Sequence, residues 1–284
     1  MSPDIVSFIN MKGGVGKTTL TINIAYTLAK EFKKNVLLID MDPQFNATQS
    51  LMTKFKSLKD YEDLRNSGKT INYILQPPRG GVTGGIFFSN EDLILNLYED
   101  PKFSELNQGA LDLIAGDLGI TTFESSRRGS EKILKEYIKE IEGKYRNKYD
   151  FILIDTPATY SIYSQSSLIS SDFYVVPISP DTFSALGFSL LHRAMKDDLT
   201  LKDTQPDMLG IIFTLTKDKV GRNKIKDEFE DEPTFSETLK ESEWIRTGNM
   251  SSFMLDMAST RGNIIVLVTE FLNKIDEKRG VKDE

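Results

Sequence analysis

A glycine- and lysine-rich stretch near the N-terminus has the residue types needed to bind phosphate. Residues 10–20 read NMKGGVGKTTL. Glycines allow backbone N–H groups to curl around a phosphate, and the start of a following helix favours the anion. In the phosphate-loop pattern G-x-x-x-x-G-K-[ST], the lysine contacts the β- and γ-phosphates and the hydroxyl binds Mg²⁺. Lys17 and Thr18 occupy these two places, so we expect a nucleotide site here.

The first half of this pattern departs from the usual one. Met11 stands in place of the first glycine, and a second lysine, Lys12, directly precedes a glycine pair. A glycine turn with two surface lysines is the alternative interpretation. A chance K-G-G-x-G-K-T has a probability of about one in ten thousand in this chain, which favours the phosphate loop.

Three aspartates follow apolar runs and supply the carboxylates that phosphate chemistry needs. Asp40 and Asp42 end the run LLIDMD, and Asp155 ends FILID. Ligands of parallel sheets lie at the carboxyl ends of the strands, where all three aspartates are expected. Taken alone, each of these aspartates could simply be a residue that forms a turn at the end of a strand. Together with the loop they indicate a Mg²⁺ site, in which Thr18, Asp40 and Asp155 bind the metal and Asp42 positions the attacking water.

The segments around these residues alternate between strand and helix patterns. Residues 4–9 (DIVSFI) form an apolar run, and residues 18–32 carry an apolar side chain every fourth position, as on one helix face. Further buried strands are predicted at 35–40, 111–116, 150–155, 173–178 and 209–214, and further helices at 131–145, 183–197 and 262–278. Near-continuous apolar strands indicate a parallel sheet covered on both faces. We therefore predict an α/β fold with a doubly wound, mostly parallel sheet and helices on both faces.

The domain organisation is predicted to be simple. No internal repeat is visible, and residues 1–284 are expected to form a single domain. Residues 77–109 contain PPRGGVTGGIFFSN followed by an acidic, weakly periodic stretch, and they do not fit the alternation. We expect a surface insertion there.

Composition excludes several classes of protein. The 284 residues are 39% hydrophobic and 27% charged, carry a formal net charge of −7 and include no cysteine. Disulfides, iron–sulfur clusters and thiol catalysis are therefore excluded. No apolar run approaches the roughly 20 residues needed to span a bilayer, and no signal peptide is visible, so a cytoplasmic protein is expected. The negative charge means that any binding to DNA must come from a local basic patch.

At this point the sequence resembles the ParA/MinD class of deviant Walker ATPases, which are P-loop NTPases, and within it the ParA-type partition ATPases. The motif K-G-G-x-G-K-[ST] is matched by residues 12–18, and D-x-D-P-Q-x-N-A-T is matched by residues 40–48. Further matches are LDLIAGDLGITTFE, YDFILIDTPATYS, SSDFYVVPISPDTFSALG and WIRTGN, so the resemblance covers almost the whole chain. The family's N-terminal helix-turn-helix extension is not expected here, because the ATPase motifs begin at once.

The resemblance implies an ATP- and Mg²⁺-dependent cycle. Lys12 matches the family's signature lysine, which crosses to the nucleotide phosphates of a second subunit, while Lys17 contacts those of its own. Asp42 matches the hydrolytic aspartate. ATP would then drive a homodimer that binds DNA nonspecifically on the nucleoid, and a ParB-like centromere-binding protein would stimulate an otherwise weak ATPase.

The nucleotide contacts implied by this resemblance are Lys12, Gly13, Gly14, Val15, Gly16, Lys17, Thr18, Thr19 and Thr214. Two departures from the family bear on this set. Thr214 stands where asparagine is frequent, which leaves the adenine contact open, and Ala158 stands where a second proline is usual.

DNA contacts are expected in the C-terminal third. Arg246 matches a family position associated with DNA binding, and Lys219 and Arg222 belong to a basic cluster at residues 217–226. A solvated lysine-rich face is an equally good interpretation of that cluster, because DEFEDE follows it.

Three other functions compete with partition. A MinD-like membrane-cycling ATPase needs a basic amphipathic C-terminal helix, whereas this chain ends NKIDEKRGVKDE, so no membrane partner is expected. A nitrogenase-type reductase needs cluster cysteines, which are missing. Other ParA-like positioning or regulatory ATPases stay open.

Overall fold

Eight strands form one sheet in the computed structural model, in the order β3-β4-β2-β5-β1-β6-β7-β8. The structure describes residues 2–76, 88–99, 109–125, 129–144, 148–181, 183–202, 204–216, 227–240 and 253–283. Neighbouring strands are parallel except for β3 and β4, which are antiparallel. The strands are β1 (Asp4–Phe8), β2 (Asn35–Asp40), β3 (Leu95–Glu99), β4 (Ala110–Ile114), β5 (Phe151–Asp155), β6 (Phe173–Ile178), β7 (Asp207–Thr216) and β8 (Leu239–Lys240).

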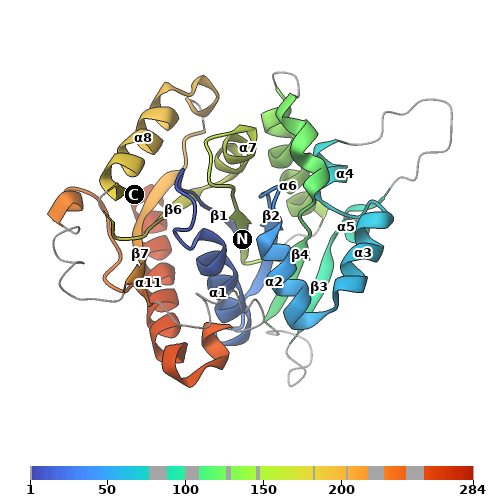
Figure 1. Cartoon of the computed structure of the whole chain (residues 1–284), viewed down its shortest axis with the longest axis horizontal. Helices are drawn as coiled ribbons and strands as arrows, with labels where there is room; N and C mark the ends of the chain where they lie inside the picture. The colour runs from blue at the N-terminus through green and yellow to red at the C-terminus, as the bar shows by residue number, and fades with distance from the viewer. Residues whose placement is uncertain are drawn as a thin grey trace.

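Helices cover both faces of this sheet (Figure 1). Helices α1, α2 and α11 pack on one face, and α4, α6, α7 and α8 pack on the other. The described α-helices are α1 (Lys17–Lys30), α2 (Asn46–Phe55), α3 (Leu58–Asn66), α4 (Ile71–Leu75), α5 (Asn90–Leu93), α6 (Ile133–Lys144), α7 (Ile162–Ser170), α8 (Ser184–Asp197) and α11 (Ala258–Asp283). Short 3₁₀ helices are η1 (Leu118–Ser125), η2 (Ser130–Lys132), η3 (Leu199–Leu201), η4 (Asp227–Phe229) and η5 (Met254–Asp256).

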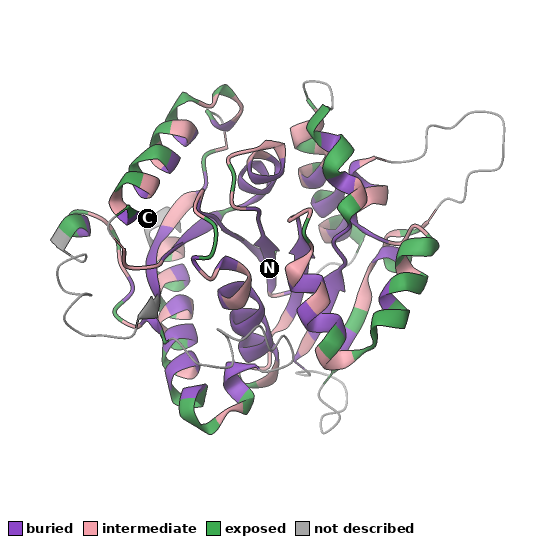
Figure 2. Ribbon diagram, viewed as in Figure 1, coloured by how far each residue is buried: buried purple, intermediate pink, exposed green. Residues whose placement is uncertain are grey.

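Side chains of the central strands point alternately to the two faces of the sheet, so the hydrophobic core has one layer on each face. In β2, Val36 and Leu38 pack with α1 and α2, whereas Leu37 and Ile39 face the layer of α4 and α6. Successive side chains of a strand point to opposite faces, so a strand buried on both sides must be apolar throughout. Figure 2 shows the result, central strands that are buried between exposed outer helix surfaces.

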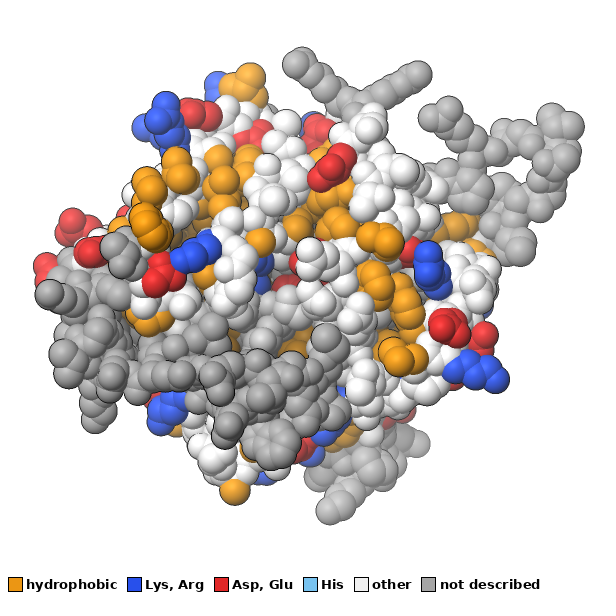
Figure 3. Space-filling model, viewed as in Figure 1, with side chains coloured by type: hydrophobic (Ala, Val, Ile, Leu, Met, Phe, Trp, Pro, Cys, Tyr) orange, Lys and Arg blue, Asp and Glu red, His pale blue; other side chains and the backbone are white. Residues whose placement is uncertain are grey.

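One helix surface remains apolar on the outside. Phe183, Leu186 and Leu190 are exposed, and Figure 3 shows hydrophobic side chains gathered over α8. They follow one another at spacings of three and four residues, which places them on one face of the helix.

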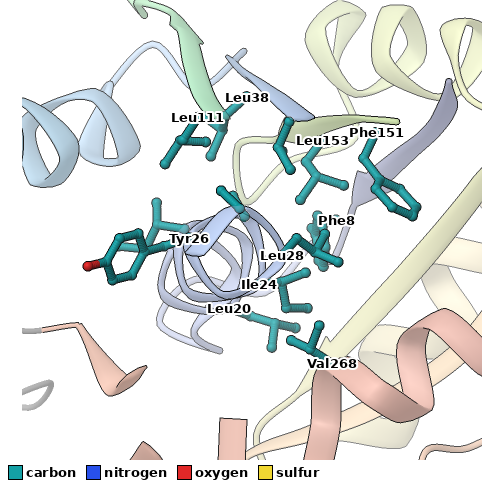
Figure 4. Packing of buried hydrophobic residues seen from close by; sticks show 14 of the residues in the cluster. Phe8, Leu20, Ile24, Tyr26, Leu28, Leu38, Leu111, Phe151, Leu153 and Val268 are labelled. Carbon is teal, nitrogen blue, oxygen red and sulfur yellow. The ribbon is translucent and has the colours of Figure 1, made fainter. Parts of the chain in front are cut away.

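Helix α1 is the centre of the larger core layer (Figure 4). Leu20, Ile24 and Leu28 are fully buried at four-residue spacing, as the sequence predicts. They lie among Phe8 and Leu153 of the sheet and Val268 of α11. This packing holds α1 firmly against β1, which fixes the position of the loop between them.

The predicted fold class is confirmed, and each strand and helix expected from the apolar patterns has a counterpart in the structure. The segment 77–109 differs in part from the expectation. Residues 88–99 form α5 and β3, and β3 pairs with β4 at the edge of the sheet. Residues 77–87 and 100–108 lie outside the described part of the chain.

Candidate nucleotide-binding site

The predicted phosphate loop connects β1 to α1 at the carboxyl end of the sheet. Gly14 and Gly16 have φ angles of 74° and 79°, in the left-handed region that glycine adopts without strain. Gly16 precedes the first turn of α1, and no side chain caps that turn. The N–H groups of the turn therefore face the loop, as they do in sites that bind phosphate at a helix N-terminus.

Two buried side chains hold the loop in shape through hydrogen bonds that join it to neighbouring strands, one from the loop itself and one from β7. Asn10 donates from Nδ2 to the Pro177 carbonyl at 2.7 Å and accepts the Lys12 N–H at 2.9 Å. Thr214 donates from Oγ1 to the Val15 carbonyl at 2.6 Å. The sequence did not lead us to predict this role for Asn10. A polar residue directly after a buried strand is the feature that could have indicated it. Thr214 was expected to contact nucleotide, and in this structure its hydroxyl contacts the loop backbone.

Lys17 lies inside the loop and is 7% exposed. Its Nζ is 3.4 Å from the Lys12 carbonyl oxygen. Burial lowers the pKa of Lys17, and the carboxylates of Asp155 and Asp42 oppose this shift. A bound anion would also oppose the lowering of the Lys17 pKa. A phosphate in the loop would therefore stabilise the charged form of Lys17.

Thr18 and Asp155 bring a hydroxyl and a carboxylate together beside Lys17. Thr18 Oγ1 donates to Asp155 Oδ2 at 2.7 Å, and Asp155 is fully buried at the end of β5. Burial raises the pKa of Asp155 well above its ordinary value, and the charge of nearby Asp40 adds to the shift. Oxygen ligands of this kind suit Mg²⁺, which usually completes its shell with water and nucleotide phosphates. The two residues fit the expected metal site.

Asp40 lies next to Asp155 across the β2–β5 pair, but its contacts point to the start of α2. Its Oδ2 accepts the Thr48 N–H at 2.8 Å and the Thr48 hydroxyl at 2.7 Å, and its Oδ1 accepts the Asp42 N–H at 3.2 Å. Burial raises the pKa of Asp40 to about 7. Asp42 is half-buried and accepts the Gln44 N–H at 2.9 Å, which forms a local turn.

Lys12 contacts a residue of its own chain. Its Nζ forms an ion pair with Asp181, in the loop between β6 and α8. The sequence did not predict this partner, because the two residues come from distant segments. The predicted contact of Lys12 with a second subunit stays a prediction.

The remaining site predictions fall outside these contacts. Arg246, Arg222 and Lys219 lie outside the described residues. Within the described ranges, no group of three or more histidine, cysteine or acidic side chains could hold a metal ion. Among the described helices, none has both the length and the apolar character to cross a membrane.

Comparison with known proteins identifies the family. A protein-family model described as an AAA domain matches residues 3–207. The virulence plasmid ParA family protein pGP5-D of Chlamydia psittaci is 29% identical over 77% of this chain and 71% of its own length. The chain belongs to the ParA family of AAA-domain ATPases.

A further relative agrees with this assignment, and a solved structure shares the fold. The chromosome-partitioning ATPase Soj of Treponema pallidum is 29% identical to this ParA-family chain over 77% of the chain and 75% of Soj. The crystal structure of a protein described as a "putative plasmid partition protein" of Borrelia burgdorferi, bound to AMPPNP, superposes with a TM-score of 0.75 at 23% identity. That superposition covers 96% of this chain and all of the Borrelia chain, so the two share their fold throughout.

Proposed function

We propose that this ParA-family protein is an ATP-driven DNA partition switch. ATP binding produces a homodimer, the dimer binds DNA without sequence preference, and a ParB-like centromere-binding protein stimulates hydrolysis and release. The observation that carries the proposal is the phosphate loop itself, in which buried Lys17 lies close to the hydrogen-bonded Thr18–Asp155 pair while Lys12 stays partly exposed. The similarity to the chromosome-partitioning ATPase Soj and the fold shared with the Borrelia protein support it.

Each loop residue then has its own role. Lys17 and the loop N–H groups bind the phosphates of the chain's own nucleotide, and Thr18 and Asp155 hold Mg²⁺. Asp40 supports the metal site indirectly, because its oxygens are engaged by Thr48 and the Asp42 N–H. Asp42, which is half-buried and close enough for its charge to act on Lys17, positions the attacking water.

The two lysines provide the first test. Lys17→Ala should abolish nucleotide binding, because the loop loses its buried cation. Lys12→Ala should still bind ATP but no longer dimerise, because Lys12 acts on the second subunit's phosphates. Lys139→Ala, on the exposed surface of α6, is the matched control and should behave as the parent. Light scattering with ATP and Mg²⁺ measures the outcome, and an ATP-dependent dimer of Lys12→Ala would refute the role in trans.

DNA binding provides the second test. At a net charge of −7, the protein can bind DNA only if dimerisation gathers basic groups on one face. Affinity for random duplex DNA should require ATP and fall by about 0.9 log units per phosphate contact for each tenfold rise in salt. Arg246→Ala should weaken it without affecting the dimer. Equal binding with ATP and ADP in a gel-shift titration would contradict the switch.

A further inference from the structure

The ion pair between Lys12 and Asp181 joins the phosphate loop to the start of α8. Side-chain exposures are 35% for Lys12 and 39% for Asp181, so the pair lies at the surface of the site. A second chain can therefore reach it. The partner of Lys12 in this structure belongs to the same chain, whereas the proposed function gives Lys12 a partner on the other subunit.

The backbone around both residues is fixed by other hydrogen bonds. The Lys12 N–H donates to Asn10 Oδ1 at 2.9 Å, and Asn10 is itself buried. Asp181 Oδ1 accepts the Phe183 N–H at 3.0 Å, and the Asp181 N–H donates to Ser184 Oγ at 3.2 Å. This turn leaves Asp181 Oδ2 directed at the lysine. An ion pair between groups held in this way has less conformational entropy to lose than an ordinary surface pair.

The charges also favour the pair in the protein without nucleotide. The hydrogen bond from Lys12 lowers the pKa of Asp181, so the carboxylate is ionised at neutral pH. The buried ammonium of Lys17 lies in the same loop, with its Nζ 3.4 Å from the Lys12 carbonyl. The loop thus contains two ammonium groups. The ion pair with Asp181 neutralises that of Lys12 and keeps it away from the phosphate-binding part of the loop.

The surface beside the pair is apolar. Phe183, two residues after Asp181, is 67% exposed, and Leu186 is 58% exposed on the same helix face. Figure 3 shows this hydrophobic surface over α8. A second copy that approaches Lys12 therefore meets apolar groups, whose burial is favourable, rather than a layer of charge that must be desolvated.

We infer that Asp181 is a positioning residue that holds Lys12 on its own chain and competes for it with the nucleotide phosphates of a second copy. The inference rests on the proposed function, because it requires Lys12 to act in trans. Dimerisation exchanges each Lys12–Asp181 pair for a lysine–phosphate contact, and a triphosphate carries more negative charge than one carboxylate. The pair thus sets the concentration at which the ATP dimer forms.

The size of the effect follows from the exposure of the pair. A partly exposed ion pair stabilises by roughly twofold to fivefold in an equilibrium constant. A symmetric dimer must break two such pairs. Removing both should therefore tighten the dimer by about four- to twenty-fivefold, while ATP binding to the monomer should not change.

The test is the substitution Asp181→Asn, which keeps an Oδ1 acceptor for the Phe183 N–H and removes the charge that holds Lys12. Asp197→Asn is the matched control, because Asp197 is an exposed acid at the other end of α8, 3.8 Å from Arg193. Sedimentation of the full chain with ATP and Mg²⁺ gives the dimer dissociation constant, and a fluorescent ATP analogue gives the monomer affinity. We expect a tighter dimer for Asp181→Asn only, with parental nucleotide affinity and, in urea unfolding, a folding equilibrium constant reduced by no more than the same roughly twofold to fivefold.

Each outcome has a distinct meaning. An unchanged or weaker dimer of Asp181→Asn, alongside a normal ATP dimer of the parent, overturns the inference and leaves the proposed function intact. A weaker dimer would mean that Asp181 supports Lys12 in the assembled state. If the parent itself forms no dimer with ATP, the proposed function fails, and the competition inferred for Asp181 fails with it.

Discussion

Replacing Thr214 by valine should reveal how far the phosphate loop depends on its neighbouring strand. Valine keeps the shape of threonine and removes the hydroxyl that donates to the Val15 carbonyl at 2.6 Å. Thr214 is fully buried and Val15 is 1% exposed, so water cannot replace the lost donor. An unsatisfied buried carbonyl costs about 1–3 kcal/mol, which is our expected loss in the free energy of unfolding.

The loss should also appear in nucleotide binding, because the Val15 carbonyl belongs to the loop that we propose to bind the phosphates. If about 1–2 kcal/mol of this cost is needed to hold the loop in the shape that binds nucleotide, the affinity for ATP and ADP decreases roughly 5- to 30-fold. Urea unfolding of the free protein and titration with a fluorescent nucleotide measure the two effects separately.

Thr214→Ser is the matched control, because it keeps the hydroxyl and loses only a buried methyl group. It should lose some stability, in the range of about 0.5–1.5 kcal/mol for a removed methyl, and keep most of its nucleotide affinity. A valine variant that binds nucleotide like the parent, while the serine variant binds weakly, would refute the reasoning.

Three further predictions concern other parts of the molecule. Asp42→Ala should slow ATP hydrolysis by roughly 10²- to 10⁴-fold and retain the ATP dimer, as a phosphate-release assay with sedimentation would show. In Gly116→Ala the added Cβ would lie 2.8 Å from Phe45 Cβ and 2.9 Å from Asp40 Cγ, so urea unfolding should detect a loss of about 1–3 kcal/mol. Burial raises the pKa of Asp4 from 3.8 to about 6, against the effect of Arg279. The protonated folded form is therefore favoured at low pH, and this contribution to stability disappears as pH rises from about 4 to about 6. Asp4→Asn should make the free energy of unfolding less dependent on pH in this range. An unchanged dependence would mean that other groups cause it.

Much of the fold was predictable because its central strands are apolar on both faces. Near-continuous runs such as residues 35–40 and 150–155 are typical of buried parallel strands, and each is followed by the aspartate that ends it. Strand β3 was missed for the opposite reason. It lies at the sheet edge with only Leu97 buried, so its sequence LNLYE carries little apolar signal.

The candidate site was predictable only where neighbours in sequence act together. The loop glycines, Lys17 and Thr18 form one local motif, and the structure places Asp155 beside them. The contacts of Asn10 with Pro177 and of Lys12 with Asp181 join segments more than 150 residues apart in the chain. Spacing along the sequence contains no information about such pairs, because they depend on the order of strands in the sheet.

The position of β1 in the middle of the sheet has a consequence for the order in which the chain acquires structure. This first strand pairs with β5 on one side and β6 on the other, so that Val6 lies opposite both Leu153 and Phe173. Contacts between residues so far apart in the sequence form late in folding, because a large loop must close before they can form. During synthesis, the phosphate loop cannot acquire its final neighbours until β6 has left the ribosome. Arg279 of α11, near the end of the described chain, then contacts Asp4 of β1 and completes the surroundings of the first strand. A growing chain shorter than about 180 residues should therefore be unable to retain nucleotide, although it already contains the whole phosphate-loop sequence.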